Sequence, residues 1–281
     1  MKSAKAFSPG NVSCIFRVID NKNPLKKHSL GVGFTVDKGV YVSVKLSKKT
    51  SITFNNKKWK LPTVVSVVNK LTDTPVKVKI KSELPLGAGF GVTGACALST
   101  AYALNKLLGL KMSKEKLAMV AHTAEVENGT GLGDVGGEFT GGFNAKFTRG
   151  KALEGVSLGI TNGDIYYKFF SNISTKKVIN SKTKKIKINK AGDKALKSVK
   201  KLINDKKINK RLRLKKIIEI SNGFSVDSGL LADKKVKKLI DKIESKGGNA
   251  SMIMLGNAVF SDTKFLGSRK VKISKRSAHL L

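Results

Sequence analysis

Pro85 to Leu108, PLGAGFGVTGACALSTAYALNKLL, is the stretch that decides the fold, because a glycine-rich turn runs without a break into an apolar helix. Closely spaced glycines allow positive φ angles and let main-chain N–H groups approach a ligand without obstruction by a Cβ atom. The helix presents unpaired N–H groups and the positive end of its dipole at the same point. The stretch therefore predicts a phosphate-binding site formed around Gly87, Gly89, Gly91 and Gly94.

The segment Gly89 to Gly94 also reads as GxGxxG, the spacing of dinucleotide-binding proteins. That interpretation requires a second strand ending in Asp or Glu about 20 residues further on, whereas more helix follows here, from Ala95 to Leu108. The common nucleoside triphosphate loop does not fit either, because no Lys-Ser or Lys-Thr pair follows the glycines. Taken alone, the loop indicates a phosphate without saying which one, and a glycine-rich turn without a ligand is the alternative.

The composition is that of a globular protein. The chain has 281 residues, enough for one large or two moderate domains, and 40% of them are hydrophobic. Its first residues lack the apolar core of a signal peptide, and the longest later apolar run, Ser251 to Phe260, is too short to span a bilayer. We therefore expect a soluble cytoplasmic protein without a membrane partner. Cys14 and Cys96 lie in apolar segments and are expected to be buried free thiols.

The net charge of +36 raises the question of nucleic-acid binding. The lysines are spread over every expected surface, with moderate clusters at Lys182 to Lys190, Lys206 to Lys216 and Lys234 to Lys242, and few aromatic residues lie among them. Dedicated RNA-binding proteins usually carry stacking aromatics or arginine-rich patches. The charge therefore indicates non-specific attraction to polyanions, and nucleic-acid binding as the main function stays a minor alternative.

Towards the N-terminus the pattern predicts short strands, in which β-branched and aromatic residues alternate between Gly or Pro breaks. The first set covers AKAFSPGNVSCIFRVI from Ala4, then Gly31 to Val36 and Gly39 to Leu46. A second set leads into the glycine loop and comprises Ser51 to Phe54, Val64 to Asn69 and Val76 to Ser82. Strand, glycine loop and helix are thus expected to follow one another directly.

Ser113 is a plausible N-cap for a helix that runs to about Glu127. His122 and Glu125 stand three residues apart and therefore project from neighbouring positions on that helix. A second glycine-rich turn, Asn128 to Asp134, then surrounds a single carboxylate. Asp134 is a candidate functional acid, and a capping or turn aspartate is the alternative.

The second half of the chain has a different residue pattern, with more lysine-rich helical segments. After a strand from Phe143 to Thr148, we expect strands at Ile165 to Phe170 and Lys185 to Ile188 among lysine-rich helices. The helices are expected at Gly192 to Ile203, Lys210 to Asn222, Ser225 to Leu231 and Lys234 to Ser245. We place a domain boundary near residue 160, which gives an N-terminal domain of residues 1–160 and a C-terminal domain of residues 161–281.

Several segments in order along the chain resemble the motifs of the GHMP small-molecule kinases, and within them the archaeal pantoate kinase branch. They are FSPGNVSCIF (7–16), HSLGVGFTVDKGV (28–40), PLGAGFGVTGACALSTAYALN (85–105), AHTAEVENGTGLGDVGGEFTGG (121–142) and ASMIMLGNAVF (250–260). The resemblance implies an α+β GHMP kinase fold, with an N-terminal domain like the second domain of ribosomal protein S5 and a ferredoxin-like C-terminal domain. It also implies a homodimer.

The reaction implied by the resemblance is the ATP-dependent phosphorylation of the primary hydroxyl of pantoate to 4-phosphopantoate, on the archaeal route to coenzyme A. Two alternatives stay open. One is a GHMP kinase acting on another small hydroxy acid or alcohol, such as homoserine or mevalonate. The other is a basic binding protein on the same scaffold without catalytic activity, which retention of Glu125 and Asp134 disfavours.

Residue by residue, the resemblance assigns Glu125 as the Mg²⁺ ligand, assisted by the Thr93 hydroxyl, and oxygen ligands of this kind suit that ion. Asp134 would be the base or the group that orients the substrate hydroxyl. The ATP phosphates would lie against Pro85, Gly87, Gly89, Gly91, Val92, Thr93 and Gly94, and the pantoate carboxylate against Ser29, His122 and Lys146.

Three positions depart from the family pattern. Thr93 stands where a serine is common, and this change should be tolerated because the hydroxyl remains. Asn11 stands where pantoate kinases often have histidine and mevalonate kinases have lysine, so the contribution of that side chain is altered. Lys146 stands where pantoate kinases usually have arginine, which keeps the charge but loses the bidentate fork.

Overall fold

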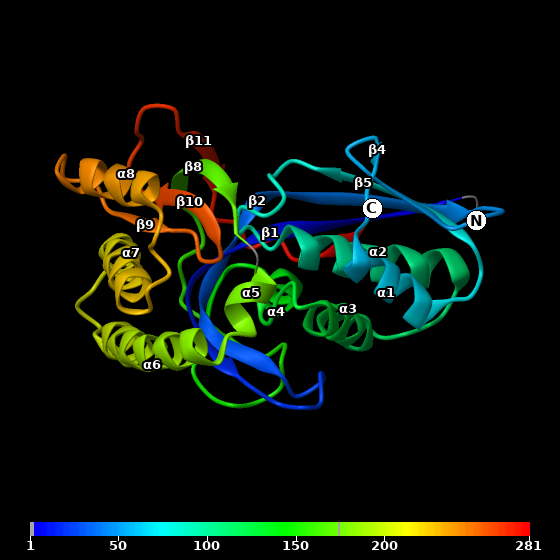
Figure 1. The fold of residues 1–281 in the computed structure, drawn as a ribbon, viewed down its shortest axis with the longest axis horizontal. Helices are drawn as coiled ribbons and strands as arrows, with labels where there is room; N and C mark the ends of the chain where they lie inside the picture. The colour runs from blue at the N-terminus through cyan, green and yellow to red at the C-terminus, as the bar shows by residue number, and fades with distance from the viewer. Residues whose placement is uncertain (1–2, 174) are drawn as a thin grey trace.

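The computed structural model describes residues 3–173 and 175–281. Its longest strands are the first two, β1 (Ala4–Ile19) and β2 (His28–Leu46). They pair antiparallel from Ala4 opposite Val44 to Ile19 opposite His28. Figure 1 shows this ribbon running from the first sheet towards the helices α5 (Thr175–Ile179) and α6 (Lys182–Asn204).

The glycines expected to break β2 lie inside it instead. An added Cβ at Gly31 would lie 2.4 Å from the Ile15 carbonyl oxygen, and one at Gly39 would lie 2.2 Å from the Ser8 carbonyl oxygen. Glycine is therefore needed because the backbone of β1 approaches closely, and the prediction of separate short strands in this region was wrong.

The first sheet has the strand order β12-β1-β2-β5-β3-β4, and β6 and β7 extend it from β2. The remaining strands are β3 (Ser51–Phe54), β4 (Lys57–Lys58), β5 (Val76–Ser82), β6 (Phe143–Lys146), β7 (Val156–Ser157) and β12 (His279–Leu280). Three helices lie together beside this sheet, namely α1 (Pro62–Leu71), α2 (Val92–Leu108) and α3 (Lys114–Asn128) (Figure 1). Helix α2 is the central one and is buried along most of its length.

The second sheet has the order β11-β8-β10-β9. Its strands are β8 (Asp164–Asn172), β9 (Ala250–Met252), β10 (Gly256–Ser261) and β11 (Arg269–Lys272). The helix α4 (Asp134–Thr140) precedes this sheet in the chain and packs against α2, α3 and β1. Of the later helices, α7 (Lys210–Asp227) and α8 (Lys234–Glu244) contact β9, whereas α6 (Lys182–Asn204) contacts β1 and α7, and α5 (Thr175–Ile179) contacts α6. The strand β12 returns to pair with β1, so the C-terminal end of the chain completes the first sheet. The domain boundary near residue 160 stays a prediction.

Two strand predictions were wrong. Both segments bury side chains at helical spacing, although their residues are β-branched or rich in lysine. Val64 to Asn69 lies in α1, which starts at Pro62 and buries Val64, Val67 and Val68 on one face. Lys185 to Ile188 lies in α6, whose buried side chains also recur at helical spacing. The separate helix expected at Ser225 to Leu231 was also wrong, since α7 continues to Asp227.

Other predictions are confirmed. Ser113 caps α3, with its side chain accepting a hydrogen bond from the Lys116 N–H. Cys14 and Cys96 are buried free thiols, and burial raises the pKa of each. In the described part of the chain, no helix is long and apolar enough to cross a membrane.

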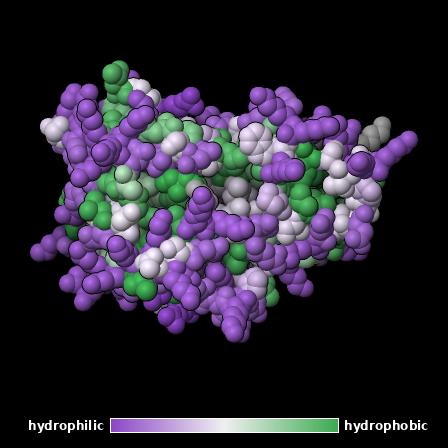
Figure 2. Space-filling view, in the orientation of Figure 1, coloured by the Kyte–Doolittle hydropathy of each residue, from purple (hydrophilic) through white to green (hydrophobic). Residues whose placement is uncertain are grey.

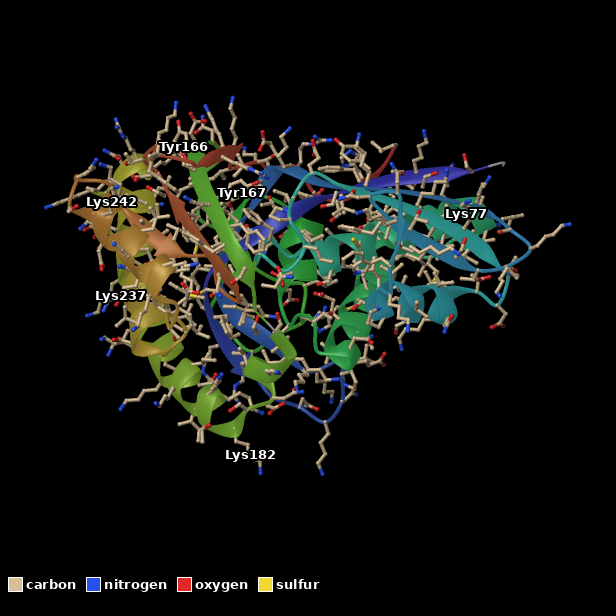
Figure 3. The ribbon with its side chains drawn as sticks, turned by 45° about the horizontal axis from the view of Figure 1, so that its top comes forward. Lys77, Tyr166, Tyr167, Lys182, Lys237 and Lys242 are labelled. Atoms are coloured by element: carbon tan, nitrogen blue, oxygen red, sulfur yellow. The ribbon has the colours of Figure 1, made fainter. Side chains whose placement is uncertain are left out.

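The basic side chains cover the outside of the molecule. Lys182 on α6 and Lys237 and Lys242 on α8 lie at its periphery (Figure 3). Hydrophilic residues dominate the face shown in Figure 2, with smaller hydrophobic patches between them. The lysines are therefore spread over the surface, as the sequence predicted.

Candidate active site

A cavity of about 410 Å³ lies where the glycine loop, the start of α2 and the turn before α4 meet. This size is typical of a small-molecule site. Five of the residues expected to bind the nucleotide line it, namely Gly87, Gly89, Gly91, Val92 and Thr93. Pro85 and Gly94 are not among its lining residues.

The backbone of the loop has the predicted form. Gly87, Gly89 and Gly91 have φ angles of +79°, +83° and +62°, which favour glycine. Gly91 is also the N-cap residue of α2, and that helix end has no side-chain cap and no acidic residue in its first turn. The first N–H groups of α2 can therefore bind an anion at the wall of the cavity.

The last of the family-like segments packs directly against this loop. An added Cβ at Gly256 would lie 2.2 Å from the Ala88 carbonyl oxygen, and one at Gly89 would lie 2.7 Å from the Met254 carbonyl oxygen. The two backbones thus touch at positions that admit only glycine. The contact explains why a glycine break near residue 256 accompanies the central loop.

Gly94 has a different role from the other loop glycines. Its φ is not in the left-handed region, but an added Cβ would lie 2.9 Å from Glu138 Oε2 and 3.0 Å from Glu125 Oε2. The absence of a side chain therefore makes room for two buried carboxyl groups behind the first turn of α2.

Glu125 lies on α3 and is 1% exposed. Its Oε1 accepts hydrogen bonds from the Thr93 hydroxyl at 2.8 Å and from the Thr130 hydroxyl at 3.1 Å. Burial and, to a smaller extent, the nearby charge of Asp134 raise the pKa of Glu125 to about 8, against the two hydrogen bonds, which lower it. The structure thus brings together Glu125 and Thr93, the two groups expected to hold the metal.

Asp134 is the first residue of α4 and lines the cavity. Its Oδ1 accepts hydrogen bonds from Asn11 Nδ2 at 2.9 Å and from the Ser13 hydroxyl at 3.4 Å. Burial raises the pKa of Asp134, and the two hydrogen bonds oppose that shift. Asn11, identified as a departure from the family pattern, is therefore a direct partner of the candidate base.

Glu138 is an acid that sequence reasoning missed. It is fully buried, and no side chain among the described residues donates a hydrogen bond to its carboxyl oxygens; only the Ala95 backbone N–H acts on it to lower its pKa. Burial raises its pKa well above the usual value, as do the charges of Asp134 and Glu125. It stands four residues after Asp134, and this spacing on one helix face was the available signal.

The donor set fits Mg²⁺ in chemistry. Thr93 and Glu125 offer oxygen atoms, and a nearby cation would favour the charged form of a carboxylate buried this deeply. Across residues 3–173 and 175–281, no three His, Cys, Asp or Glu side chains are grouped to hold a metal ion by themselves. Further ligands would be water or phosphate oxygens, as is usual for Mg²⁺.

A smaller cavity of about 80 Å³ adjoins the first, and Ser13, Phe16, Ser29 and Gly133 line both. An added Cβ at Gly133 would lie 2.4 Å from Ser29 Oγ, so this hydroxyl lies beside the residue that precedes Asp134. Lys146 lines the smaller cavity from β6. Its ammonium donates to the Lys151 carbonyl, and burial lowers its pKa to about 8.

His122 lies apart from both cavities. It is 2% exposed, and its Nε2 lies 3.0 Å from the Lys27 carbonyl oxygen. Burial, together with the neighbouring His28 and Lys146, lowers the pKa of His122 to about 4, against the contact with the Lys27 carbonyl, which raises it. The structure therefore brings Ser29 and Lys146 to the second cavity, whereas His122 is a neutral side chain behind them.

Comparison with known proteins shows which family has these residues and this fold. The family model for the GHMP kinases N terminal domain matches residues 60–142, which include the glycine loop, Glu125 and Asp134. The pantoate kinase of Methanocaldococcus jannaschii is 33% identical over 264 residues, covering 92% of this chain and 92% of the relative. The chain belongs to the pantoate kinase family of the GHMP kinases.

Other members and solved structures agree with this family. The pantoate kinase of Methanospirillum hungatei is 27% identical and covers 96% of this chain and 90% of its own length. A solved phosphotransferase related to the CoA biosynthesis pathway has a TM-score of 0.83 at 23% identity, covering 99% of this chain and 98% of its own. The homoserine kinase of Cytophaga hutchinsonii has a TM-score of 0.69 at 18% identity, covering 100% and 98%. The prediction of a GHMP kinase fold is confirmed.

Proposed function

We propose that this chain transfers the γ-phosphoryl group of ATP to the primary hydroxyl of pantoate, which gives 4-phosphopantoate and ADP on the archaeal route to coenzyme A. The observation that carries the proposal is one cavity lined by both the glycine loop at the start of α2 and Asp134. The relatives named as pantoate kinases, which align over nearly the whole chain, support the choice of substrate.

The loop residues Gly87 to Thr93 would bind the phosphates through main-chain N–H groups. Phosphoryl transfer depends on positioning and on stabilising charge at the transferred group. Glu125 and Thr93 would hold Mg²⁺, which neutralises charge on the phosphates when it is bound. The first turn of α2 supplies fixed dipoles at the same place without reorganisation.

Asp134 would accept the proton of the attacking hydroxyl. Asn11 and Ser13 both bond to its Oδ1, which leaves Oδ2 for the substrate. Because burial raises the pKa of this carboxyl, Asp134 is a stronger base than an exposed aspartate. Asn11 orients the carboxylate without adding a positive charge that would lower its pKa.

Ser29 and Lys146 would bind the carboxylate of pantoate in the smaller cavity, where a charge-assisted hydrogen bond is strong. His122 would support this site as a neutral imidazole, because its pKa of about 4 leaves it uncharged at pH 7. We also expect the protein to be cytoplasmic and to form a homodimer. Light scattering on the purified protein would test the dimer by its mass.

The test is ADP release by purified protein with ATP, Mg²⁺ and one candidate acceptor at a time: pantoate, homoserine, mevalonate, shikimate or galactose. We expect turnover with pantoate that depends on Mg²⁺. Turnover with another acceptor and none with pantoate would overturn the assignment and favour a different GHMP kinase activity.

A further inference from the structure

The outer face of the first sheet carries a line of lysines. The strand β5 places Lys77, Lys79 and Lys81 on this face, because alternate residues of a strand point to the same side. Val78 and Ile80 point to the other side and are buried there, where α2 packs against β1, β2 and β5. Lys77 lies on the outside of the molecule, at the opposite end from Lys237 and Lys242 of α8 (Figure 3).

Pairing between the strands adds further cations to this face. Lys45 of β2 lies directly opposite Lys77. Lys5 of β1 and Lys58 of β4 lie in the same transverse row as Lys79, which they reach through Ser43 and Thr53. We call this set the lysine face: Lys5, Lys45, Lys58, Lys77, Lys79 and Lys81. None of the six side chains forms an ion pair with a described residue.

The lack of acids distinguishes the lysine face from the lysine-rich helices. No Asp or Glu occurs in the paired strand residues around it, which are 4–7, 41–46, 51–54, 57–58 and 76–82. Glu83, which follows β5, pairs with Lys38 at 3.2 Å. By contrast, Lys194 of α6 pairs with Asp227 of α7 at 2.7 Å, and α8 carries two acids among its lysines. The positive charge of the lysine face is therefore not compensated within the chain.

This charge arrangement suits an extended polyanion. Like charges directly opposite each other in a sheet are destabilising, so an anion lying over Lys45 and Lys77 would offset their repulsion. Alternate residues of a strand are about 7 Å apart, so the three lysines of β5 form an extended line. A chain of phosphates can follow such a line, whereas a single small anion can neutralise only part of it.

An aromatic ring lies at one end of the line. Tyr41 of β2 is directly opposite Lys81, and its ring centroid is 5.0 Å from that of Phe7. Phe7 is fully buried, and the Arg276 guanidinium lies 4.2 Å from the centroid of its ring. Tyr41 is partly exposed, so its ring can receive a ligand. A stacking ring beside a track of cations is the combination with which proteins bind single-stranded nucleic acids.

We propose that the lysine face binds single-stranded nucleic acid, with phosphates along β5 and a base on Tyr41. None of these residues lines the cavity of the glycine loop, so the proposal is independent of the proposed kinase activity. The sequence alone does not show this cluster, because its lysines come from four strands and no segment of β1, β2 or β5 is a run of basic residues.

The first test measures the anisotropy of a short fluorescein-labelled oligouridylate at several salt concentrations. The face variant, Lys77→Gln/Lys79→Gln/Lys81→Gln, should weaken binding roughly 10- to 100-fold at physiological salt. It should also reduce the slope of log affinity against log salt by about 2, since each phosphate contact to a single strand contributes ~0.7. Urea denaturation checks that the variant is folded.

The matched control is Lys234→Gln/Lys237→Gln/Lys242→Gln on α8, which removes the same charge at the opposite end of the molecule (Figure 3). It should bind the oligouridylate within about 2-fold of wild type, because charges far beyond the Debye length of ~8 Å are screened. Equal losses in the two triple variants would show that net charge alone attracts the oligonucleotide, and would overturn the proposal.

A second variant tests the class of ligand. Tyr41→Leu keeps an apolar side chain against Phe7 but removes the stacking ring. It should weaken oligouridylate binding about 5-fold or more and leave the binding of inorganic polyphosphate, which has no base, unchanged. Equal affinity of Tyr41→Leu and wild type for the oligouridylate would overturn the assignment to a nucleic acid. So would binding of phosphatidylglycerol vesicles by a wild-type protein that does not bind the oligouridylate.

Discussion

At the scale of single residues, the contact between Asn11 and Asp134 is the most informative. The Asn11 amide donates to the Asp134 carboxylate at 2.9 Å. A neutral donor orients the acid without the attraction that a lysine or a charged histidine would exert, and so the pKa of Asp134 stays raised by burial. Asn11 therefore suits a site in which Asp134 acts as a base.

Asp134→Asn should lower kcat by roughly 10²- to 10⁴-fold, the contribution typical of a general base, with little effect on ADP affinity. The amide keeps the shape but cannot accept the hydroxyl proton. Steady-state kinetics and calorimetry with ADP measure the two effects separately. Asp37→Asn, at an aspartate that bonds only the Lys272 N–H in the described structure, serves as control. A near-normal kcat for Asp134→Asn would remove this residue from the chemistry.

Lys146→Ala should raise KM for pantoate by about 10-fold or more while KM for ATP changes little, since a hydrogen bond to a charged group contributes ~1.5–3 kcal/mol. In the wild type, KM for pantoate should also rise above pH 8, because burial lowers the pKa of Lys146 to about 8 and the ammonium loses its charge there. The control is Lys151→Ala, which leaves in place the main-chain carbonyl that Lys146 contacts. Equal shifts of both KM values would exclude Lys146 as the carboxylate contact.

At the scale of elements, the packing around the first turn of α2 explains why this helix has a glycine at position 94. Replacing glycine by alanine inside a helix normally stabilises it by ~0.5–1 kcal/mol. At Gly94 the new Cβ would lie 3.0 Å or less from oxygens of Glu125 and Glu138. The buried acids, and not the helix, therefore determine this residue.

We therefore expect opposite results from two glycine-to-alanine variants. Gly94→Ala should lower the free energy of unfolding by about 1–3 kcal/mol, as overpacking does. Gly223→Ala in α7 should raise it by ~0.5–1 kcal/mol, because an added Cβ there meets nothing within 4 Å. Urea denaturation measures both. A Gly94→Ala protein as stable as wild type would show that the acids move aside at no cost.

At the scale of the whole molecule, the buried acids make stability depend on pH. The folded-state pKa values of Glu125, Asp134 and Glu138 are all raised, and that of Glu125 is about 8. The folded protein therefore binds more protons than the unfolded chain above pH 4.5, so the stability from these groups is lost as pH rises through their folded-state pKa values. His122, whose pKa falls to about 4, acts in the opposite direction, but only below pH 6.5.

Without nucleotide or divalent cation, the free energy of unfolding should accordingly fall between pH 6.5 and pH 8, by at most ~1.4 kcal/mol per pH unit for each acid. Urea denaturation at several pH values measures this slope. Glu125→Gln should flatten it, because the amide does not titrate, whereas Glu127→Gln, a partly exposed neighbour on the same helix, should not. A slope of zero or of opposite sign in the wild type would contradict the expectation.

The sequence alone determined the features that depend on local chemistry. Closely spaced glycines followed by an apolar helix predicted the anion site, and the cap at Ser113 predicted the start of α3. Ordered family-like segments identified the kinase fold. Local pattern failed where β-branched residues such as Val64, Val67 and Val68 occupy one face of a helix, since their propensity favours strands and only packing overrides it.

Only the tertiary structure decided which distant residues meet. Asn11 and Asp134 are 123 residues apart in sequence, and Glu138 reaches Gly91 and Gly94 from another helix. No local periodicity encodes these contacts, because they depend on how α2 and α4 pack against β1 and on how α3 packs against α2 and α4. The same packing placed His122 behind the cavity and Trp59 at its wall, since burial and neighbours, not residue type, determine which side chains can reach a ligand.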